Sequence, residues 1–562
     1  MAKQNKTDFQ NVPAVAAGFI NRVISKMRYR RRVCRDVRAE LAAHFEDELR
    51  GCKTDEEKQQ KALEVIAGFG DVKMLAVLLR RAKKRCRPLW RTVVARTFQI
   101  TSLLLLCLIL YTIWFSTGKP TISVDYLAML NRMSRPEVSN KDNAWPHLEK
   151  ATSLYVDPNQ DLREKTPAFS NIGSPEYRDF AGLPEADRNA ITEYVRVNEQ
   201  AWGEFVAASS KSCCYHEYGF DPNCSDQDKR MWSIILPHLG EFRGLARVGV
   251  WRCRIDIARG SIGEALNDCL TMARNAGHLQ RLSTIIEQLT GLSLSNLANQ
   301  EILRTLESTD LTAGQLKDLQ GQLAQVYAGG YPVMNLEFDK MVFHDLVQHL
   351  FTDGGFGGGH LIPAGWAEIS DDREDERMFL MPLLVATSMV HARRDENLEV
   401  GDRIYDEQII KLARMTPYQR HRKNVPSTDD ILTSLSSRKF FLLHFIVPAF
   451  DRTFEFAFRV KASHQATLTI LALARWRAEK GEYPASLDQL TAAGLLKDLP
   501  MDPWSDKPLI YRRTGDNFIL YSLGPNFEDN GGKPATDSKG RPKKWLDNDD
   551  TVFWPLLELQ SQ

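Results

Sequence analysis

The sequence lacks the short motifs that most often mark an active site. It contains no H-E-x-x-H, G-x-S-x-G, C-x-x-C or Walker motif. These absences argue against a zinc-protease helix, a nucleophile elbow, a dithiol redox motif and a phosphate loop. No A-x-A cleavage site follows the one long apolar run, and nearly a hundred residues precede it, which argues against a signal peptide. The sequence therefore predicts a protein that is not an enzyme.

Charge is absent from one long segment. No Asp, Glu, Lys or Arg occurs between Arg96 and Lys119, and eleven of the nineteen residues of Phe98–Ser116 are Leu, Ile or Phe. At about 1.5 Å per residue, this segment makes a helix of roughly 28 Å, close to the hydrocarbon thickness of a bilayer. A buried core helix is the alternative, but a soluble helix of this length usually keeps one polar face. Residues 97–117 are therefore predicted to form a single transmembrane helix.

The charge balance divides the chain into a basic and an acidic part. Residues 1–97 contain 23 Lys and Arg against 11 Asp and Glu, a net charge of +12, whereas the rest contains 50 against 61, a net charge of −11. Because basic flanks stay in the cytoplasm, we expect an inner (plasma) membrane protein with a cytoplasmic N-terminus and a periplasmic or extracytoplasmic C-terminal part. The basic tail is expected to bind anionic lipid. Nucleic-acid binding is the alternative for this tail, but Arg28–Arg32 lacks a base-reading motif, so no nucleic-acid partner is expected.

Cysteine is scarce, and its placement is uneven. Of nine cysteines, five follow the apolar segment and would lie in an oxidising space: Cys213, Cys214, Cys224, Cys253 and Cys269. Because five is odd, at least one is unpaired or forms an intermolecular bond. Cys213 or Cys214 paired with Cys224 is the expected disulfide. A zinc site from these three cysteines and His216 is the alternative, although adjacent cysteines are poor tetrahedral ligands compared with C-x-x-C.

Residues 1–90 are predicted to form a cytoplasmic bundle of four short amphipathic helices. Gly51 ends one of these helices, and Thr54-x-x-Glu57 is a capping box that opens the next. Val37–Asp47, followed by this capping box and by Gly70-Asp71, resembles the permease-prefix or HTH-associated α-helical signalling domain. The resemblance implies a signalling or regulatory module.

Residues 120–450 are predicted to form a helical ectodomain. Apolar residues recur every three or four positions in several long stretches. These stretches are Asp187–Ala208, Leu239–Arg259, Ile262–Ala276 and Leu282–Leu306. No second copy occurs at a fixed period, so the pattern favours an irregular stack of α-helical hairpins over a repeat array.

Residues 452–562 are predicted to form a small α+β module. A helix ending at Gly481 precedes Leu509–Arg512 and Phe518–Gly524, which alternate between apolar and polar residues and are joined by a turn at Gly515-Asp516. This pattern predicts a short antiparallel sheet. Gly481–Pro484, Asp502–Trp504, Leu509–Arg512 and Tyr521–Gly524 follow one another in this order. They resemble the globular part of the major pseudopilin of type II secretion, with its G-x-Y-P, D-P-W, Y-x-Y and Y-S-L-G motifs.

The pseudopilin resemblance implies a calcium site. In that family the loop after the last motif binds calcium through carboxylates and carbonyls, the oxygen ligands that this ion prefers. The candidate ligands here are Asn526, Asp529, Asp547 and Asp549. Asn526 stands where the family pattern has Asp, and Lys533–Trp545 is a basic insertion. A solvated acidic turn is the alternative.

Together these features predict a mainly α protein with one transmembrane helix, a helical hairpin stack as ectodomain and a small α+β C-terminal module. The whole resembles uncharacterised membrane proteins of planctomycete-type bacteria. A pilin polymerises through an exposed apolar N-terminal helix, whereas this module lies at the far C-terminus. We therefore expect a single-pass envelope protein that acts as an interaction or assembly factor related to secretion systems, with protein partners in the envelope. A transmembrane signalling protein that acts through residues 1–90 is the alternative.

Overall fold

The computed structural model of the chain is mainly helical. It describes residues 9, 11–85, 89–137, 139–174, 177, 179–223, 229–236, 238–354, 358–363, 365, 390–447 and 450–556. Within these residues the strands form two small antiparallel sheets, one of two strands and one of three. The predicted fold class is confirmed.

The chain divides into two compact units, Met1–Ile113 and Trp114–Gln562. The boundary falls near the end of the long apolar helix. Residues 120–450 and 452–562, predicted as separate domains, both belong to the second unit. The boundary between them stays a prediction.

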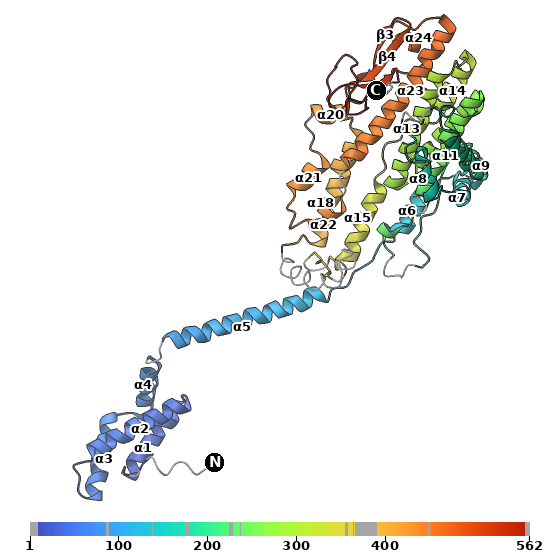
Figure 1. Cartoon of the computed structure of the whole chain (residues 1–562). Coiled ribbons are helices and arrows are strands. Elements are labelled where there is room, and N and C mark those ends of the chain that lie inside the picture. The colour runs from blue at the N-terminus through green and yellow to red at the C-terminus, as the bar shows by residue number, and fades with distance from the viewer. Residues whose placement is uncertain are drawn as a thin grey trace. The chain divides into compact units, whose positions relative to one another are not determined.

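The first unit is built around a four-helix bundle (Figure 1). Its helices are α1 (Ala14–Met27), α2 (Arg31–Glu48), α3 (Asp55–Phe69) and α4 (Val72–Arg85). The predicted capping box opens α3, because the hydroxyl of Thr54 accepts from the N–H of Glu57 at 3.3 Å. Phe19 and Phe45 are buried, and the ring of Phe69 lies 5.8 Å from each of them. The bundle thus has an aromatic core of its own.

Helix α5 (Leu89–Ser116) carries the predicted membrane segment. Its stretch Thr92–Ser116 contains an 18-residue window with a mean hydropathy of 2.1, and among the described residues no other helix is long and apolar enough to cross a membrane. The side chains of Leu103–Leu106 are 52–64% exposed. Thr101 and Thr112 donate their hydroxyl groups to backbone carbonyls of the preceding turn at 2.9 and 2.8 Å. By its length, composition and exposed apolar side chains, α5 is a candidate to span a membrane.

The second unit begins with a first helical group. It contains α6 (Tyr126–Ser134), α7 (Trp145–Leu154), α8 (Gln160–Lys165), α9 (Glu185–Val197), α10 (Glu199–Ser209), α11 (Leu239–Arg259), α12 (Ile262–Leu279), α13 (Ile285–Ser308) and α14 (Ala313–Gln325), with the short 3-10 turns η1 (Asn140–Asp142), η2 (Pro167–Phe169) and η4 (Met231–Ser233). Trp202, Phe205 and Trp251 lie almost fully buried in its core. Helices α11 and α12 form a hairpin around Gly260, whose positive φ of 79° ends α11.

The stretch Asp187–Ala208, in which the sequence shows helical spacing, contains two helices, α9 and α10. Asn198 separates α9 from α10, and its side chain is fully buried. It accepts from the N–H of Val156 at 2.8 Å and donates to the carbonyl of Val156 at 3.0 Å. These two side-chain bonds tie the break between α9 and α10 to a distant part of the chain. Periodicity alone does not reveal them.

A second helical group has a separate core. It contains α15 (Glu337–Leu350), α18 (Arg394–Arg403), the π-helical turn η5 (Ile404–Ile409), α19 (Ile410–Arg414), α20 (Pro417–Arg422), α21 (Thr428–Ser434) and α22 (Phe441–Ile446). Phe115, at the end of α5, is 1% exposed and belongs to this core together with Phe343, Tyr405 and Phe450. The last turn of the apolar helix is therefore part of the second unit.

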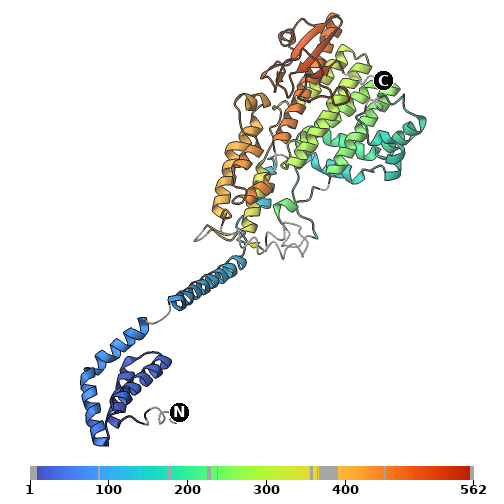
Figure 2. The same ribbon diagram turned by 60° about the vertical axis from the view of Figure 1, so that its left-hand side comes forward.

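The C-terminal module follows α23 (Asp451–Lys480), which runs alongside α13 and α14 in both views (Figure 1 and Figure 2). Gly481, with a φ of 83°, ends α23 where the sequence predicts. The module contains α24 (Asp488–Ala492), β1 (Met501–Asp502), β2 (Lys507–Pro508), β3 (Ile510–Thr514), β4 (Asn517–Ser522) and β5 (Thr551–Trp554). Strands β3 and β4 form the predicted hairpin, and β5 pairs with β4.

The D-P-W motif holds this module together. Asp502 is 1% exposed, and its carboxylate accepts from the N–H groups of Trp504 at 3.0 Å and Leu523 at 3.1 Å. It also accepts from the hydroxyl of Ser522 at 2.7 Å. One buried carboxylate thus joins the D-P-W turn to the end of β4.

Candidate functional site

A loop of residues 213–219, the 213–219 loop, is fixed by two asparagine side chains. Asn143 donates to the carbonyl of Tyr215 at 2.8 Å and accepts from the N–H of Tyr215 at 2.9 Å. Asn131 makes the same pair of bonds with Tyr218, at 3.0 and 2.8 Å. Because Asn143 lies just before α7 and Asn131 lies on α6, these bonds hold the loop against both helices.

Aromatic rings gather where the 213–219 loop meets α7. Trp145, the first residue of α7, stacks on His216 with 3.8 Å between ring centroids and 18° between planes. His238 and Phe242 approach Trp145 edge-on, at 5.9 and 6.1 Å. These rings form one wall of the site.

Glu287 lies behind His216 in the first turn of α13. Its side chain is 2% exposed, and its Oε1 lies 2.7 Å from His216 Nε2. Its Oε2 accepts from the hydroxyl of Tyr218 at 2.8 Å and from the N–H and hydroxyl of Thr284 at 3.1 and 2.6 Å. The N-terminal end of a helix stabilises a carboxylate at this position. Burial, followed by the charge of Glu287, raises the pKa of Tyr218.

His216 faces an oxygen acceptor on each side of its ring. Nε2 meets Glu287, and Nδ1 lies 3.3 Å from the carbonyl oxygen of Glu217. Each ring nitrogen of His216 therefore lies within hydrogen-bond distance of an oxygen, while the ring itself stacks on the indole of Trp145. The dyad is therefore a buried pair whose polar atoms are already engaged.

His216 lines two cavities. The larger has a volume of about 260 Å³ and apolar or aromatic walls, with Glu149 and Glu217 exposed at its rim. Its other lining residues are Trp145, His216, Gly219, Phe220, Pro222, Ile235, Leu236, His238, Leu239, Phe242 and Glu287. The smaller, of about 190 Å³, is lined on its polar side by Ser134, Arg281 and Ser283.

Both oxygens of Glu287, which lines the larger cavity, lie within hydrogen-bond distance of neighbouring side chains, namely His216, Tyr218 and Thr284. The cavity is lined by the aromatic side chains of Trp145, Phe220 and Phe242, and two exposed carboxylates, Glu149 and Glu217, also line it. Aromatic faces flanked by negative charge recognise cations, such as the head of a lysine or arginine side chain.

The predicted disulfide residues lie beside this site. The thiol of Cys213 contacts the carbonyl of Asp142 at 3.3 Å, and Cys214 lines the smaller cavity. Burial raises the pKa of the Cys214 thiol well above its usual value. Cys224 lies outside the described residues, so the disulfide stays a prediction. For the zinc alternative, the described residues hold no group of three His, Cys, Asp or Glu that could bind a metal ion.

The four predicted calcium ligands have other partners or point to solvent. Asn526 donates to Asn530 at 2.8 Å, and Asp529 accepts from Tyr521 and Gly531 at 2.9 Å each. Asp549 pairs with Lys533 at 2.8 Å, and Asp547 is exposed. They do not converge as one ligand set in the described part of the chain. Calcium binding stays a prediction.

Asp550, which the sequence reasoning missed, organises this acidic loop. Its carboxylate accepts from the N–H groups of Gly532 at 2.7 Å and Asn530 at 3.3 Å. Its pKa is raised, first by burial and then by the charges of Asp529 and Asp549. The loop is thus shaped by carboxylate-to-backbone bonds.

Most of the residues that build the cavity carried no signal in the sequence. His216 was a candidate only as a zinc ligand, and Trp145, Asn131 and Asn143 belong to no motif. Glu287 had one available signal, the capping box Thr284-x-x-Glu287, which explains its backbone bond but not its contact with His216, 71 residues away. No family model, no curated protein and no solved structure matches the chain.

Proposed function

We propose that this chain is a single-pass envelope protein of the inner membrane that captures a protein partner through its helical ectodomain. The observation that best supports this proposal is the cavity lined by Trp145, other aromatic side chains and the exposed carboxylates Glu149 and Glu217. Beside Trp145, His216 and Glu287 are already hydrogen-bonded to each other. The partner presents a lysine or arginine side chain to this cavity. The role is that of an interaction or assembly factor, and the pseudopilin-like module relates it to secretion systems.

Charge supports this choice of partner and the orientation in the membrane. The chain beyond residue 97 contains 50 Lys and Arg against 61 Asp and Glu, so the proposed ectodomain attracts basic partners. The basic residues before α5 favour a cytoplasmic N-terminus, next to anionic lipid. An alkaline phosphatase fusion at the C-terminus should be active and one at residue 90 inactive. The reverse result contradicts the orientation.

The binding proposal is tested on the full chain in detergent. The probe is a labelled hexalysine peptide, with hexa-acetyl-lysine as the neutral match. Trp145→Ala and the pair Glu149→Gln with Glu217→Gln should each weaken hexalysine binding about tenfold, since one lost cation–π or charge contact is worth about 1–2 kcal/mol. Trp232→Ala and Glu193→Gln, exposed and outside the cavity, are the matched controls. Equal losses in the controls, or equal binding of both peptides, contradict the proposal.

A signalling role is the second candidate. It is favoured by the compact four-helix bundle that precedes α5, because a separate core allows this unit to act as a module. Deleting residues 1–85 alone distinguishes the two functions. Loss of a transcriptional response with intact partner capture favours signalling, whereas intact transcription favours the interaction role.

A further inference from the structure

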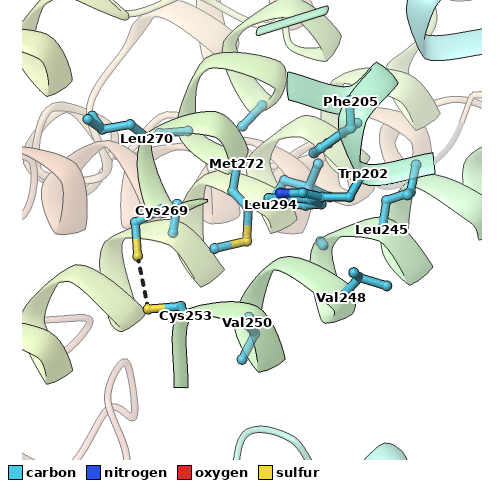
Figure 3. Packing of buried hydrophobic residues seen from close by; sticks show 14 of the residues in the cluster. Trp202, Phe205, Leu245, Val248, Val250, Cys253, Cys269, Leu270, Met272 and Leu294 are labelled. Atoms are coloured by element: carbon cyan, nitrogen blue, oxygen red, sulfur yellow. Dashed lines mark hydrogen bonds between the residues drawn. The ribbon is translucent and has the colours of Figure 1, made fainter. Parts of the chain in front are cut away.

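Two cysteines face each other across the α11–α12 hairpin. The Sγ atoms of Cys253 on α11 and Cys269 on α12 lie 3.5 Å apart (Figure 3). Both side chains are fully buried, and they point toward each other from neighbouring helices. The hydroxyl of Thr305 lies 3.8 Å from Cys253 Sγ.

Close helix packing brings the two sulfur atoms together. Gly249 lies one turn before Cys253, and a Cβ at this position would be 2.6 Å from the ring of Trp202 and 2.9 Å from the sulfur of Met272. The absence of a side chain therefore lets α11 approach α12 closely. The hairpin turn at Gly260 sets the register that places Cys253 opposite Cys269.

The surroundings of Cys253 and Cys269 argue against metal binding, nucleophilic catalysis and redox sensing by these thiols. No third His, Cys, Asp or Glu within the described chain completes a metal group with them. The site is apolar and closed, and the pKa of the Cys269 thiol is raised well above its usual value by Cys253 and by burial. A thiol that resists ionisation and cannot reach solvent is neither a nucleophile nor an exposed redox sensor.

We infer that Cys253 and Cys269 form a structural disulfide in the mature protein, an inference that rests on the extracytoplasmic location proposed above. One thiolate attacks a sulfur of an oxidising protein disulfide and forms a mixed disulfide with that donor. The second thiolate then attacks the cysteine sulfur of the mixed disulfide, and the donor's thiolate leaves. The two cysteines lose two protons and two electrons, and the donor leaves as a dithiol. The sulfur atoms close from 3.5 Å to about 2.05 Å. Because both thiols are buried once the hairpin has packed, this exchange takes place while the hairpin forms.

This pairing leaves an odd number of cysteines beyond α5. With Cys253 and Cys269 joined, three remain, namely Cys213, Cys214 and Cys224. The predicted bridge to Cys224 then uses one of the two adjacent residues and leaves the other as a thiol.

The test is made on the full chain isolated from membranes and denatured directly in N-ethylmaleimide. After digestion without reduction, mass spectrometry should find the Cys253 and Cys269 peptides linked, and a reductant should separate them. Cys34 and Cys52, in the basic tail, should carry the label and serve as internal controls. In Cys269→Ser, Cys253 should become labelled. Labelled Cys253 and Cys269 in the parent protein overturn the inference.

The phosphatase fusion separates two reasons for such a failure. If the C-terminal fusion is active while both cysteines are labelled, the location stands and the disulfide is wrong. If the C-terminal fusion is inactive as well, the proposed location fails together with the inference built on it.

Discussion

The buried ion pair between α11 and α13 offers the sharpest test of how the first helical group is held together. Arg254 and Glu301 are 3% and 2% exposed. Arg254 donates to the two carboxylate oxygens of Glu301 at 2.9 and 3.2 Å, and to the carbonyls of Tyr177 and Ile172 at 2.8 and 3.0 Å. Removing the carboxylate leaves a guanidinium in the core without its counter-charge.

The cost of that change follows from burial. Glu301→Gln keeps the shape but removes the charge, and breaking a buried pair on one side costs about 3–5 kcal/mol. Unfolding entropy is about 2 cal/mol/K per residue, which over the unit Trp114–Gln562 gives about 0.9 kcal/mol/K. The midpoint of thermal unfolding should therefore fall by about 3–5 °C.

A double variant separates charge from packing. Arg254→Met with Glu301→Leu removes both buried charges, and Arg304, which also pairs with Glu301, is 17% exposed and can be solvated. The double variant should therefore lose less free energy of unfolding than Glu301→Gln alone, about 1 kcal/mol for each carbonyl left without a donor. Calorimetry of the full chain in detergent measures the midpoint of thermal unfolding of both variants. Glu193→Gln, in an exposed pair with Arg196, should leave the midpoint unchanged. A shift below 1 °C for Glu301→Gln, or a larger loss in the double variant, refutes the reasoning.

Three further predictions concern other parts of the second unit. Asp502→Ala leaves the N–H groups of Trp504 and Leu523 without an acceptor, so the free energy of unfolding should fall by about 3 kcal/mol and proteolysis of the C-terminal module should accelerate. Burial lowers the pKa of His464 from 6.5 to about 4. Because only the unfolded chain binds this proton between pH 6.5 and 4, stability should fall as pH is lowered through this range, and less so in His464→Gln measured by pH-dependent melting. A reductant should lower the unfolding free energy by about 3 kcal/mol more in the parent protein than in a variant with Cys253 and Cys269 both replaced by alanine, if the α11–α12 hairpin carries its disulfide.

Local patterns predicted the elements well. The stretch Leu239–Arg259 is a single helix with these bounds, because apolar spacing and the left-handed Gly260 both act within a few residues. The hairpin of β3 and β4 turns at Gly515-Asp516 for the same kind of reason. The break at Asn198 was missed, since its cause is a bond to Val156 from another part of the chain.

The candidate site shows the limit of such patterns. His216 meets Glu287 only because Asn131 and Asn143 hold the 213–219 loop against α6 and α7. None of these contacts leaves a period, a spacing or a motif in the sequence. Two of the predicted calcium ligands likewise have partners that no motif reveals, because Asp529 accepts from Tyr521 and Asp549 pairs with Lys533.

By itself, the sequence determined the properties that depend on neighbours along the chain. These are the uncharged apolar run of α5, the opposite charges of the two parts, the helix caps and the strand alternation, and each follows from interactions across a few residues. The tertiary structure alone decided which polar groups are buried together. It placed Trp145 on His216, Arg254 on Glu301 and Cys253 opposite Cys269, because such partners are selected by how whole helices pack.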